Sequence, residues 1–257
     1  MIISHTYRYL FVELPRTGST AISKELREHY DGSRILHKHA TYEAFLKVAS
    51  PEEKKYFVFS GIRHPMDDVV SLYFKYLTDH KRRFSNANKR AKRKGLVGYL
   101  TARRFNFVQA HESDFPTYFR RYYRVPYDTW SSLSHKRFDF VIRFEQLQDD
   151  FAQALQRIGI EPARPLPAAN PTSGRRRDFL SYYTPDIAPH ARHVFGPYLK
   201  RWNYSFPAEW GDSAVSRWSE WQYRFFGMFR RFYWRHLRPY LHTPADDLDE
   251  KDDADAA

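Results

Sequence analysis

Two short apolar runs, at residues 9–14 and 56–62, constrain the fold more than any other feature of this sequence. They read YLFVEL and YFVFSGI, and neither shows the strict alternation of a strand with one solvated face. A helical pattern follows each run, one starting near Thr20 and the other at Pro65. Strands that are apolar on both faces and lead into helices are typical of a parallel sheet with helices on both sides.

The rest of the chain continues this alternation. Residues 34–36 and 138–144 predict further strands, whereas 41–49 and 147–158 predict helices, the last of them ending at Gly159. Ligands of such sheets bind at the carboxyl ends of the strands. The loops that follow the strands are therefore the first places to look for a functional site.

The first of these loops lies in residues 14–20, which read LPRTGST. Gly18 permits close approach of the backbone, and successive N–H groups at a helix N-terminus form a cradle for an anion. Arg16 adds a charged fork, and Ser19 and Thr20 add hydroxyl donors. The segment also fits an ordinary strand–helix turn. It is not a Walker A loop, because no lysine follows the glycine.

The second loop lies in residues 61–73, which read GIRHPMDDVVSLY. Arg63 stands where the predicted strand ends, and Ser71 lies about two turns into the next helix. Both side chains could meet one phosphate above the sheet edge. The alternative is that Arg63 pairs with Asp67 or Asp68 as a local brace.

Together, the two segments resemble the binding motifs of sulfotransferases that use 3′-phosphoadenosine 5′-phosphosulfate (PAPS), especially the uronyl and other carbohydrate O-sulfotransferases. The first resembles their 5′-phosphosulfate loop, P-K-T-G-x-[ST], with Arg16 in place of the usual lysine. The second resembles their 3′-phosphate motif, R-[ND]-P followed by S-x-Y, with His64 in place of Asn or Asp. Weaker matches, among them Glu145-x-Leu147, extend the resemblance over roughly residues 7–206.

The resemblance implies a P-loop-like, three-layer α/β/α fold with a central parallel sheet and a helical C-terminal extension. It implies in-line transfer of a sulfuryl group from PAPS to an acceptor hydroxyl, with 3′,5′-ADP as product and no metal. His39 would be the catalytic base, with His37 as the alternative, and Arg16 would also act in catalysis. The cofactor-binding residues would be Arg16, Thr17, Gly18, Ser19, Thr20, Ala21, Arg63, Ser71, Arg175 and Arg176. The two late arginines could instead form a surface patch.

Charge is distributed unevenly along the chain. The net charge is +12, but residues 245–257 carry seven acids and one lysine, which leaves the rest at +18. We expect a sulfotransferase domain over residues 1–212 with a basic insertion at 81–95, a basic aromatic helical extension at 213–241, and an acidic disordered tail at 242–257. Such a basic body attracts an anionic partner. The insertion would either recruit an acidic acceptor or simply be solvated.

The expected acceptor is a carbohydrate or glycolipid, and the expected location is the cytoplasm. Residues 213–241 could contact an anionic membrane surface, or dock on the core or at a dimer interface. Other functions remain open: an ATP-dependent kinase or NTPase, and a non-catalytic nucleotide- or polyanion-binding protein. No zinc-finger, helix-turn-helix or RNP signature supports nucleic-acid binding. The absence of cysteine excludes disulfides and thiolate chemistry.

Overall fold

The computed structural model describes residues 1–86, 95–110, 114–129, 138–167, 178–211 and 214–233. The chain divides into two compact units. Unit 1 comprises Met1–His64 and Thr129–Pro171, and unit 2 comprises Pro65–Asp128 and Thr172–Ala257. The division falls inside the second predicted motif, between His64 and Pro65. Each unit has its own hydrophobic core.

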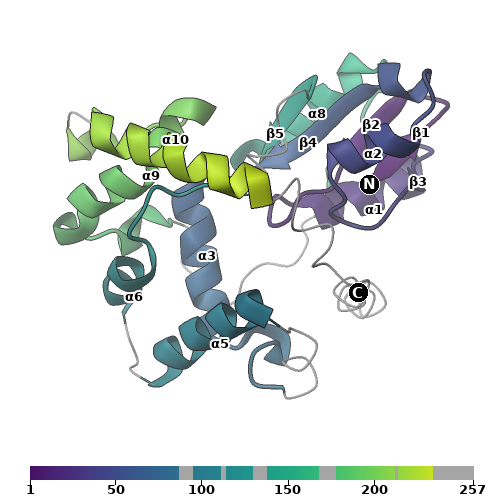
Figure 1. Cartoon of the computed structure of the whole chain (residues 1–257). Coiled ribbons are helices and arrows are strands. Elements are labelled where there is room, and N and C mark those ends of the chain that lie inside the picture. The colour runs from purple at the N-terminus through teal and green to yellow at the C-terminus, as the bar shows by residue number, and fades with distance from the viewer. Residues whose placement is uncertain (87–94, 111–113, 130–137, 168–177, 212–213, 234–257) are drawn as a thin grey trace. The chain divides into compact units, whose positions relative to one another are not determined.

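Unit 1 is built on a five-stranded sheet with the order β3-β1-β2-β4-β5 (Figure 1). Its strands are β1 (Ile2–Ser4), β2 (Tyr9–Val12), β3 (Ser33–Arg34), β4 (Phe57–Ile62) and β5 (Phe140–Arg143). Strands β2, β4 and β5 are parallel, which confirms the predicted parallel core. Strand β1 pairs antiparallel with β2 and with β3. Because only a few residues join β1 to β2, the chain must reverse there and the pair cannot be parallel.

Helices cover both faces of this sheet, as the apolar character of the central strands predicts. All four residues of β2 are buried. On one face, Phe11 and Phe59 pack with α1 (Ser19–His29) and α8 (Leu147–Arg157). On the other face, Leu10 and Val58 pack against α2 (Tyr42–Val48) through Phe45. The α/β/α layering expected from the sequence is therefore present within unit 1.

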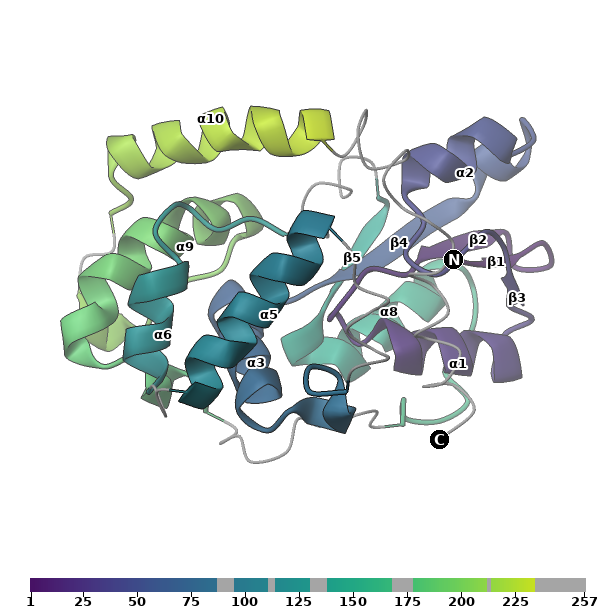
Figure 2. The same ribbon diagram turned by 60° about the horizontal axis from the view of Figure 1, so that its bottom comes forward.

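Unit 2 is helical in the residues that the structure describes (Figure 2). Its helices are α3 (Pro65–Leu77), α5 (Gly95–Ala110), α6 (Phe115–Tyr122), α9 (Ala188–Trp202) and α10 (Arg217–Phe232). Short 3₁₀ turns lie at His80–Arg82, Leu180–Tyr182, Pro185–Ile187 and Ala208–Trp210. Aromatic rings dominate the core: Phe119 of α6 is fully buried and stacks on Phe195 of α9 at 5.4 Å between ring centroids.

Some expected segments differ from the structure or lie outside it. The sequence Ser50-Pro51-Glu52-Glu53 predicts a helix start, and Ser50 and Glu53 do hydrogen-bond reciprocally. The helix is nevertheless a single 3₁₀ turn, Glu53–Lys55, because β4 begins at Phe57. Of the basic insertion, residues 87–94 are outside the described chain, and so is the acidic tail. Helix α10 occupies the middle of the predicted 213–241 extension.

Candidate functional site

The loop between β2 and α1 is held in a defined conformation by its own residues. Arg16 has φ 66° and Gly18 has φ 76°, so two of its residues occupy the left-handed region. The Thr17 hydroxyl is buried and donates a hydrogen bond to the Leu14 carbonyl oxygen at 2.9 Å. The Thr17 side chain therefore braces the loop, and its contribution to anion binding is limited to its backbone N–H.

Two glycines allow this loop to lie directly on the sheet edge. A Cβ atom on Gly61, near the end of β4, would be 2.8 Å from the Thr17 Cβ. A Cβ atom on Gly18 would be 3.1 Å from the Leu147 side chain and 3.3 Å from the Phe144 ring. Both approaches are too close for a larger residue without a shift of the loop. Gly61 thus accommodates Thr17 of the loop, and Gly18 accommodates the side chains of Leu147 and Phe144.

The N-terminus of α1 has the character of an anion-binding site. Gly18 occupies the N-cap position, so no side chain caps the helix, and its first turn contains no acid. By contrast, Thr41 caps α2, Asp114 caps α6 and Ser216 caps α10. The partial positive charge of the α1 N-terminus is thus not offset by a carboxylate of its own first turn.

The predicted cradle residues differ in their accessibility. Arg16 and Thr20 are exposed, whereas Ser19 is buried. The Ala21 N–H donates to the Gly18 carbonyl oxygen at 3.1 Å, inside the first helical turn. Ala21 therefore contributes its place in the helix, and the N–H groups of residues 17–20 are the candidate anion donors.

Arg63 lies beside the same loop. Because β2 and β4 are parallel neighbours, their carboxyl ends meet at one edge of the sheet. The Arg63 guanidinium is 4.3 Å from the centroid of the Phe144 ring, and one of its nitrogens is 3.5 Å from the Arg16 carbonyl oxygen. The structure thus brings Arg16 and Arg63, predicted from two separate segments, to one sheet edge.

The remaining predicted cofactor residues are not tested by this arrangement. Ser71 belongs to α3 in unit 2, where it is buried. Asp68, considered as a partner of Arg63, accepts a hydrogen bond from the Tyr127 hydroxyl within unit 2. Arg175 and Arg176 lie outside the described residues. Their assignment stays a prediction.

His39 is positioned by the strand that leads into the same loop. It precedes α2, has φ 61°, and its Nδ1 lies 2.9 Å from the Glu13 carbonyl oxygen. A carbonyl oxygen only accepts hydrogen bonds, so Nδ1 must carry the proton. In neutral His39, Nε2 therefore holds the lone pair, as a general base requires. His37 is more exposed, and its carbonyl oxygen accepts the Ala40 N–H.

Three residues that follow β5 support the site, and their roles could not be derived from the sequence. The Glu145 carboxylate accepts the backbone N–H of His64 at 2.6 Å and so holds the chain directly after Arg63. Phe144 lies under the Arg63 guanidinium, and Leu147 packs against Gly18. In the sequence, only the Glu145-x-Leu147 pattern pointed to this segment, and it did not show which residues these side chains contact.

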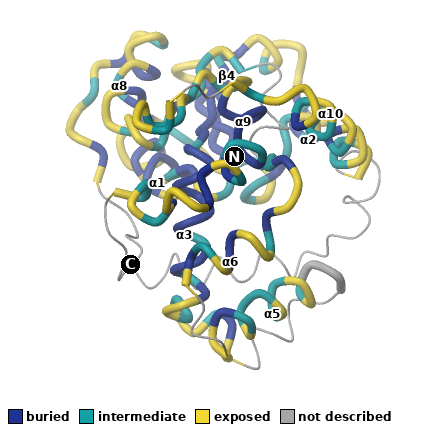
Figure 3. The backbone as a smooth tube through the Cα atoms, turned by 90° about the vertical axis from the view of Figure 1, so that its left-hand side faces the viewer, coloured by how far each residue is buried: buried dark blue, intermediate teal, exposed yellow. Residues whose placement is uncertain are grey.

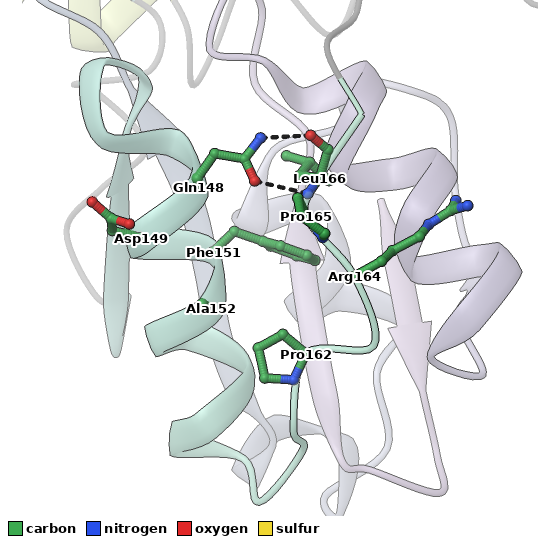
Figure 4. Close-up of a pocket in the computed structure, with 8 residues that line it drawn as sticks. All are labelled: Gln148, Asp149, Phe151, Ala152, Pro162, Arg164, Pro165 and Leu166. Atoms are coloured by element: carbon green, nitrogen blue, oxygen red, sulfur yellow. Dashed lines mark hydrogen bonds between the residues drawn. The ribbon is translucent and has the colours of Figure 1, made fainter.

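A cavity of about 350 Å³ lies elsewhere in unit 1, between α8 and the segment that follows it (Figure 4). None of the predicted site residues lines it. Gln148 makes two hydrogen bonds to the backbone of Leu166, and Arg164 forms an ion pair with Glu25. Gln148 and Arg164 thus have structural partners, and the cavity is not the candidate site.

Comparison with known proteins identifies the family. Residues 1–197 match the family model described as "Sulfotransferase family", a range that covers most of the chain and contains all of the predicted site residues. The chain belongs to the sulfotransferase family. Its members transfer sulfuryl groups, so this sulfotransferase is an enzyme of that general class. A search of curated proteins and a search of solved structures each found no match.

Two further findings bear on this sulfotransferase. Among the residues that the structure describes, no group of three or more His, Cys, Asp or Glu side chains is arranged to hold a metal ion. In the same part of the chain, no helix is both long and apolar enough to cross a membrane.

Proposed function

We propose that this enzyme transfers the sulfuryl group of PAPS to a hydroxyl group of its acceptor. The observation that carries the proposal is the contact of the Arg63 guanidinium with the Arg16 carbonyl oxygen, in the loop that leads to the uncapped N-terminus of α1. A polyanionic nucleotide suits such a site, because backbone N–H groups and guanidinium forks bind phosphate and sulfate oxygens.

The donor-binding roles follow from this geometry and from the motifs. Arg16 and the N–H groups of residues 17–20 bind the 5′-phosphosulfate. Arg63 binds the 3′-phosphate, with Ser71 assigned to it from the motif alone. The Phe144 ring holds the Arg63 guanidinium at 4.3 Å, which limits the orientations open to this side chain. Arg175 and Arg176 are proposed to complete the nucleotide site.

Catalysis rests on positioning and on charge stabilisation. When bound, PAPS supplies the sulfuryl group and leaves as 3′,5′-ADP. Nε2 of His39 accepts the proton of the acceptor hydroxyl while the acceptor oxygen bonds to sulfur. Arg16 and the loop N–H groups stabilise the negative charge that grows on the phosphate oxygen as its bond to sulfur breaks. The hydrogen bond to Glu13 keeps His39 in the tautomer that this step needs.

The proposed acceptor is a carbohydrate or the sugar of a glycolipid. Its support is the resemblance of both binding motifs to the carbohydrate O-sulfotransferases. The charge of +18 outside the acidic tail favours an acceptor that already bears carboxylate or sulfate groups.

The competing nucleotide-dependent functions have less support. An ATP-dependent kinase or NTPase of the P-loop type requires a lysine after the loop glycine, and Ser19 stands there. A non-catalytic nucleotide-binding role does not require the His39 tautomer in which Nε2 holds the lone pair.

Calorimetric titration with 3′,5′-ADP, 5′-AMP and ATP tests the donor site. We expect the wild type to bind 3′,5′-ADP best, because only this nucleotide presents a 3′-phosphate to Arg63. Arg63→Ala should weaken 3′,5′-ADP binding roughly tenfold to a hundredfold, as expected for a lost charge-assisted contact of about 1.5–3 kcal/mol. Binding of 5′-AMP should change little.

Arg157→Ala is the matched control. Arg157 also stacks on an aromatic ring, with its guanidinium 4.6 Å from the Phe140 centroid, but it lies at the far end of α8. It should leave all three affinities unchanged. Equal affinity for the three nucleotides, or an Arg63→Ala variant that binds 3′,5′-ADP as the wild type does, would refute the assignment.

A further inference from the structure

Helix α10 packs on unit 2 through one face only. The fully buried Ser219 donates its hydroxyl to the His193 carbonyl oxygen of α9 at 2.5 Å. On the same side, Arg230 donates to the Pro126 carbonyl oxygen at 2.8 Å, and Glu220 pairs with Lys200 of α9. These contacts fix the rotation of α10 about its axis.

The opposite face of α10 is apolar and exposed. Figure 3 colours the backbone by burial and includes exposed residues on this helix. Trp218 and Phe229 are each 59% exposed and Trp221 is 52% exposed. The exposed stripe consists of Trp218, Trp221, Phe225, Met228, Phe229 and Phe232. From Trp218 to Phe232, the row spans about 21 Å along the helix. This contiguous apolar area is larger than the single, scattered apolar side chains that are normal on a protein surface.

The rings of the stripe hold one another in place. Trp218 stacks on Trp221 with centroids 4.9 Å apart, and Trp221 stacks on Phe225 at 5.1 Å. Phe225 meets Phe229 edge to face, also at 5.1 Å. Because the rings are already ordered, a surface that receives them pays little additional side-chain entropy.

Basic side chains border the stripe. Arg217, Arg224 and Arg231 recur every seven residues and so lie along one side of the helix. Arg217 and Arg224 are exposed. Glu220 is the single acid between Arg217 and Phe232, and it is the residue paired with Lys200. The exposed side of α10 thus combines aromatic rings with a net positive charge.

We propose that α10 lies flat in the headgroup region of an anionic membrane, with the stripe inserted and the arginines at lipid phosphates. Charge complementarity selects this occupant: a basic edge beside tryptophan and phenylalanine is the pattern of helices that rest on anionic bilayers. The inference goes beyond the proposed sulfuryl transfer and does not depend on it. It names an anionic bilayer as the surface that this helix contacts.

Vesicle cosedimentation of the full chain tests the proposal. We expect binding to vesicles of phosphatidylcholine and phosphatidylglycerol, and little binding to phosphatidylcholine alone. Trp221→Gln combined with Phe225→Gln should weaken binding roughly tenfold or more, because two inserted rings are lost. Arg217→Gln combined with Arg224→Gln should weaken it by a similar factor, at roughly fivefold for each charge.

Matched controls separate these effects from general ones. Tyr99→Gln removes an aromatic ring that is 64% exposed on α5, and Lys47→Gln with Lys54→Gln removes two exposed charges from unit 1. Both variants should bind as the wild type does. In the wild type, brominated lipid should quench tryptophan fluorescence, a readout that needs no variant.

Two results would overturn the inference. One is equal vesicle binding by the stripe variant and the wild type. The other is a lipid-free dimer in sedimentation velocity that the stripe variant converts to a monomer, since the stripe would then be an interface between two copies of this chain.

Discussion

At the scale of single residues, Arg16 and His39, which are proposed to act in catalysis, both have a left-handed backbone conformation. Arg16 and His39 have φ values of 66° and 61°, a region that costs a residue with a side chain roughly 1–3 kcal/mol. Each is held there by local hydrogen bonds: Arg63 donates to the Arg16 carbonyl oxygen, and His39 bonds to Glu13. Strain of this kind persists where surrounding contacts over-determine the backbone, and it concentrates at functional sites.

His39 gives the sharpest residue-scale prediction. His39→Ala should lower the turnover of sulfuryl transfer by roughly 10²–10⁴, the usual contribution of a general base, while the affinity for 3′,5′-ADP changes little. Turnover with PAPS and calorimetry on the same variant check both parts.

His37→Ala is the control, because His37 is the nearest alternative base in the sequence. It should retain most of the turnover. If His39→Ala stays within about threefold of the wild type, the base lies elsewhere.

Local sequence predicted the site only where neighbouring residues define it. Arg16, Gly18 and Arg63 could be placed because each follows a recognisable buried strand. The contact between the His64 N–H and Glu145 joins residues 81 positions apart, and no local pattern encodes it. The inward direction of the Thr17 hydroxyl was missed for a similar reason, since it depends on how the loop lies on Gly61.

At the scale of elements, the apolar runs predicted the central strands and the helices after them. Strands β2, β4 and β5 and helices α1, α3 and α8 all overlap the segments expected. Strand β1 has three residues, too few for a period to be recognised. In α10, the basic aromatic pattern at 213–241 predicted a helix, whereas the central place of Trp221 between Trp218 and Phe225 is seen only in the structure.

A half-buried histidine in α9, His190, predicts how stability depends on pH. Burial lowers the pKa of His190, and His193, Arg120 and Arg124 lower it further, although the hydrogen bond with the Tyr123 carbonyl oxygen acts in the opposite direction. The folded state therefore binds this proton less readily than the unfolded state. Its contribution to stability is present above the ordinary histidine pKa of about 6.5 and is lost as pH falls below that value.

Urea unfolding at several pH values between about 5 and 8 measures this effect. The free energy of unfolding of the wild type should fall more steeply below pH of about 6.5 than that of His190→Gln. Parallel curves for the two proteins would mean that His190 does not contribute.

At the scale of the whole molecule, both units are discontinuous in sequence. The chain passes between them after His64, Asp128 and Pro171. The alternation of strands and helices predicted the layers of unit 1, but it could not show that a helical unit interrupts them. That division depends on which buried residues pack together, and the cores of the two units draw on segments far apart in the chain.

Truncation should therefore unfold unit 1. A fragment of residues 1–128 lacks Ile142, Phe151 and Leu155, which are at most 2% exposed in the core of the sheet. Each such side chain contributes about 2–5 kcal/mol, and together they match the net stability of about 5–15 kcal/mol typical of a domain. Thermal unfolding followed by circular dichroism should show no cooperative transition for the fragment.

Adding the complementary fragment, residues 129–257, tests whether the missing core residues restore the fold of unit 1. Recovery of a cooperative transition in the mixture would support the discontinuous core. A cooperative transition in the 1–128 fragment alone would contradict it.

The contact between Gly61 and Thr17 has a consequence for how this sequence can diverge. With 2.8 Å between the Thr17 Cβ and a Cβ placed at position 61, the two sites cannot both carry a side chain in this loop conformation. Substitutions at positions 17 and 61 should therefore be coupled, so that a larger side chain at one position is accompanied by a smaller one at the other. A descendant that gains a side chain at position 61 and keeps Thr17 inherits a displaced loop, so selection on the loop becomes selection on a strand residue 44 positions away.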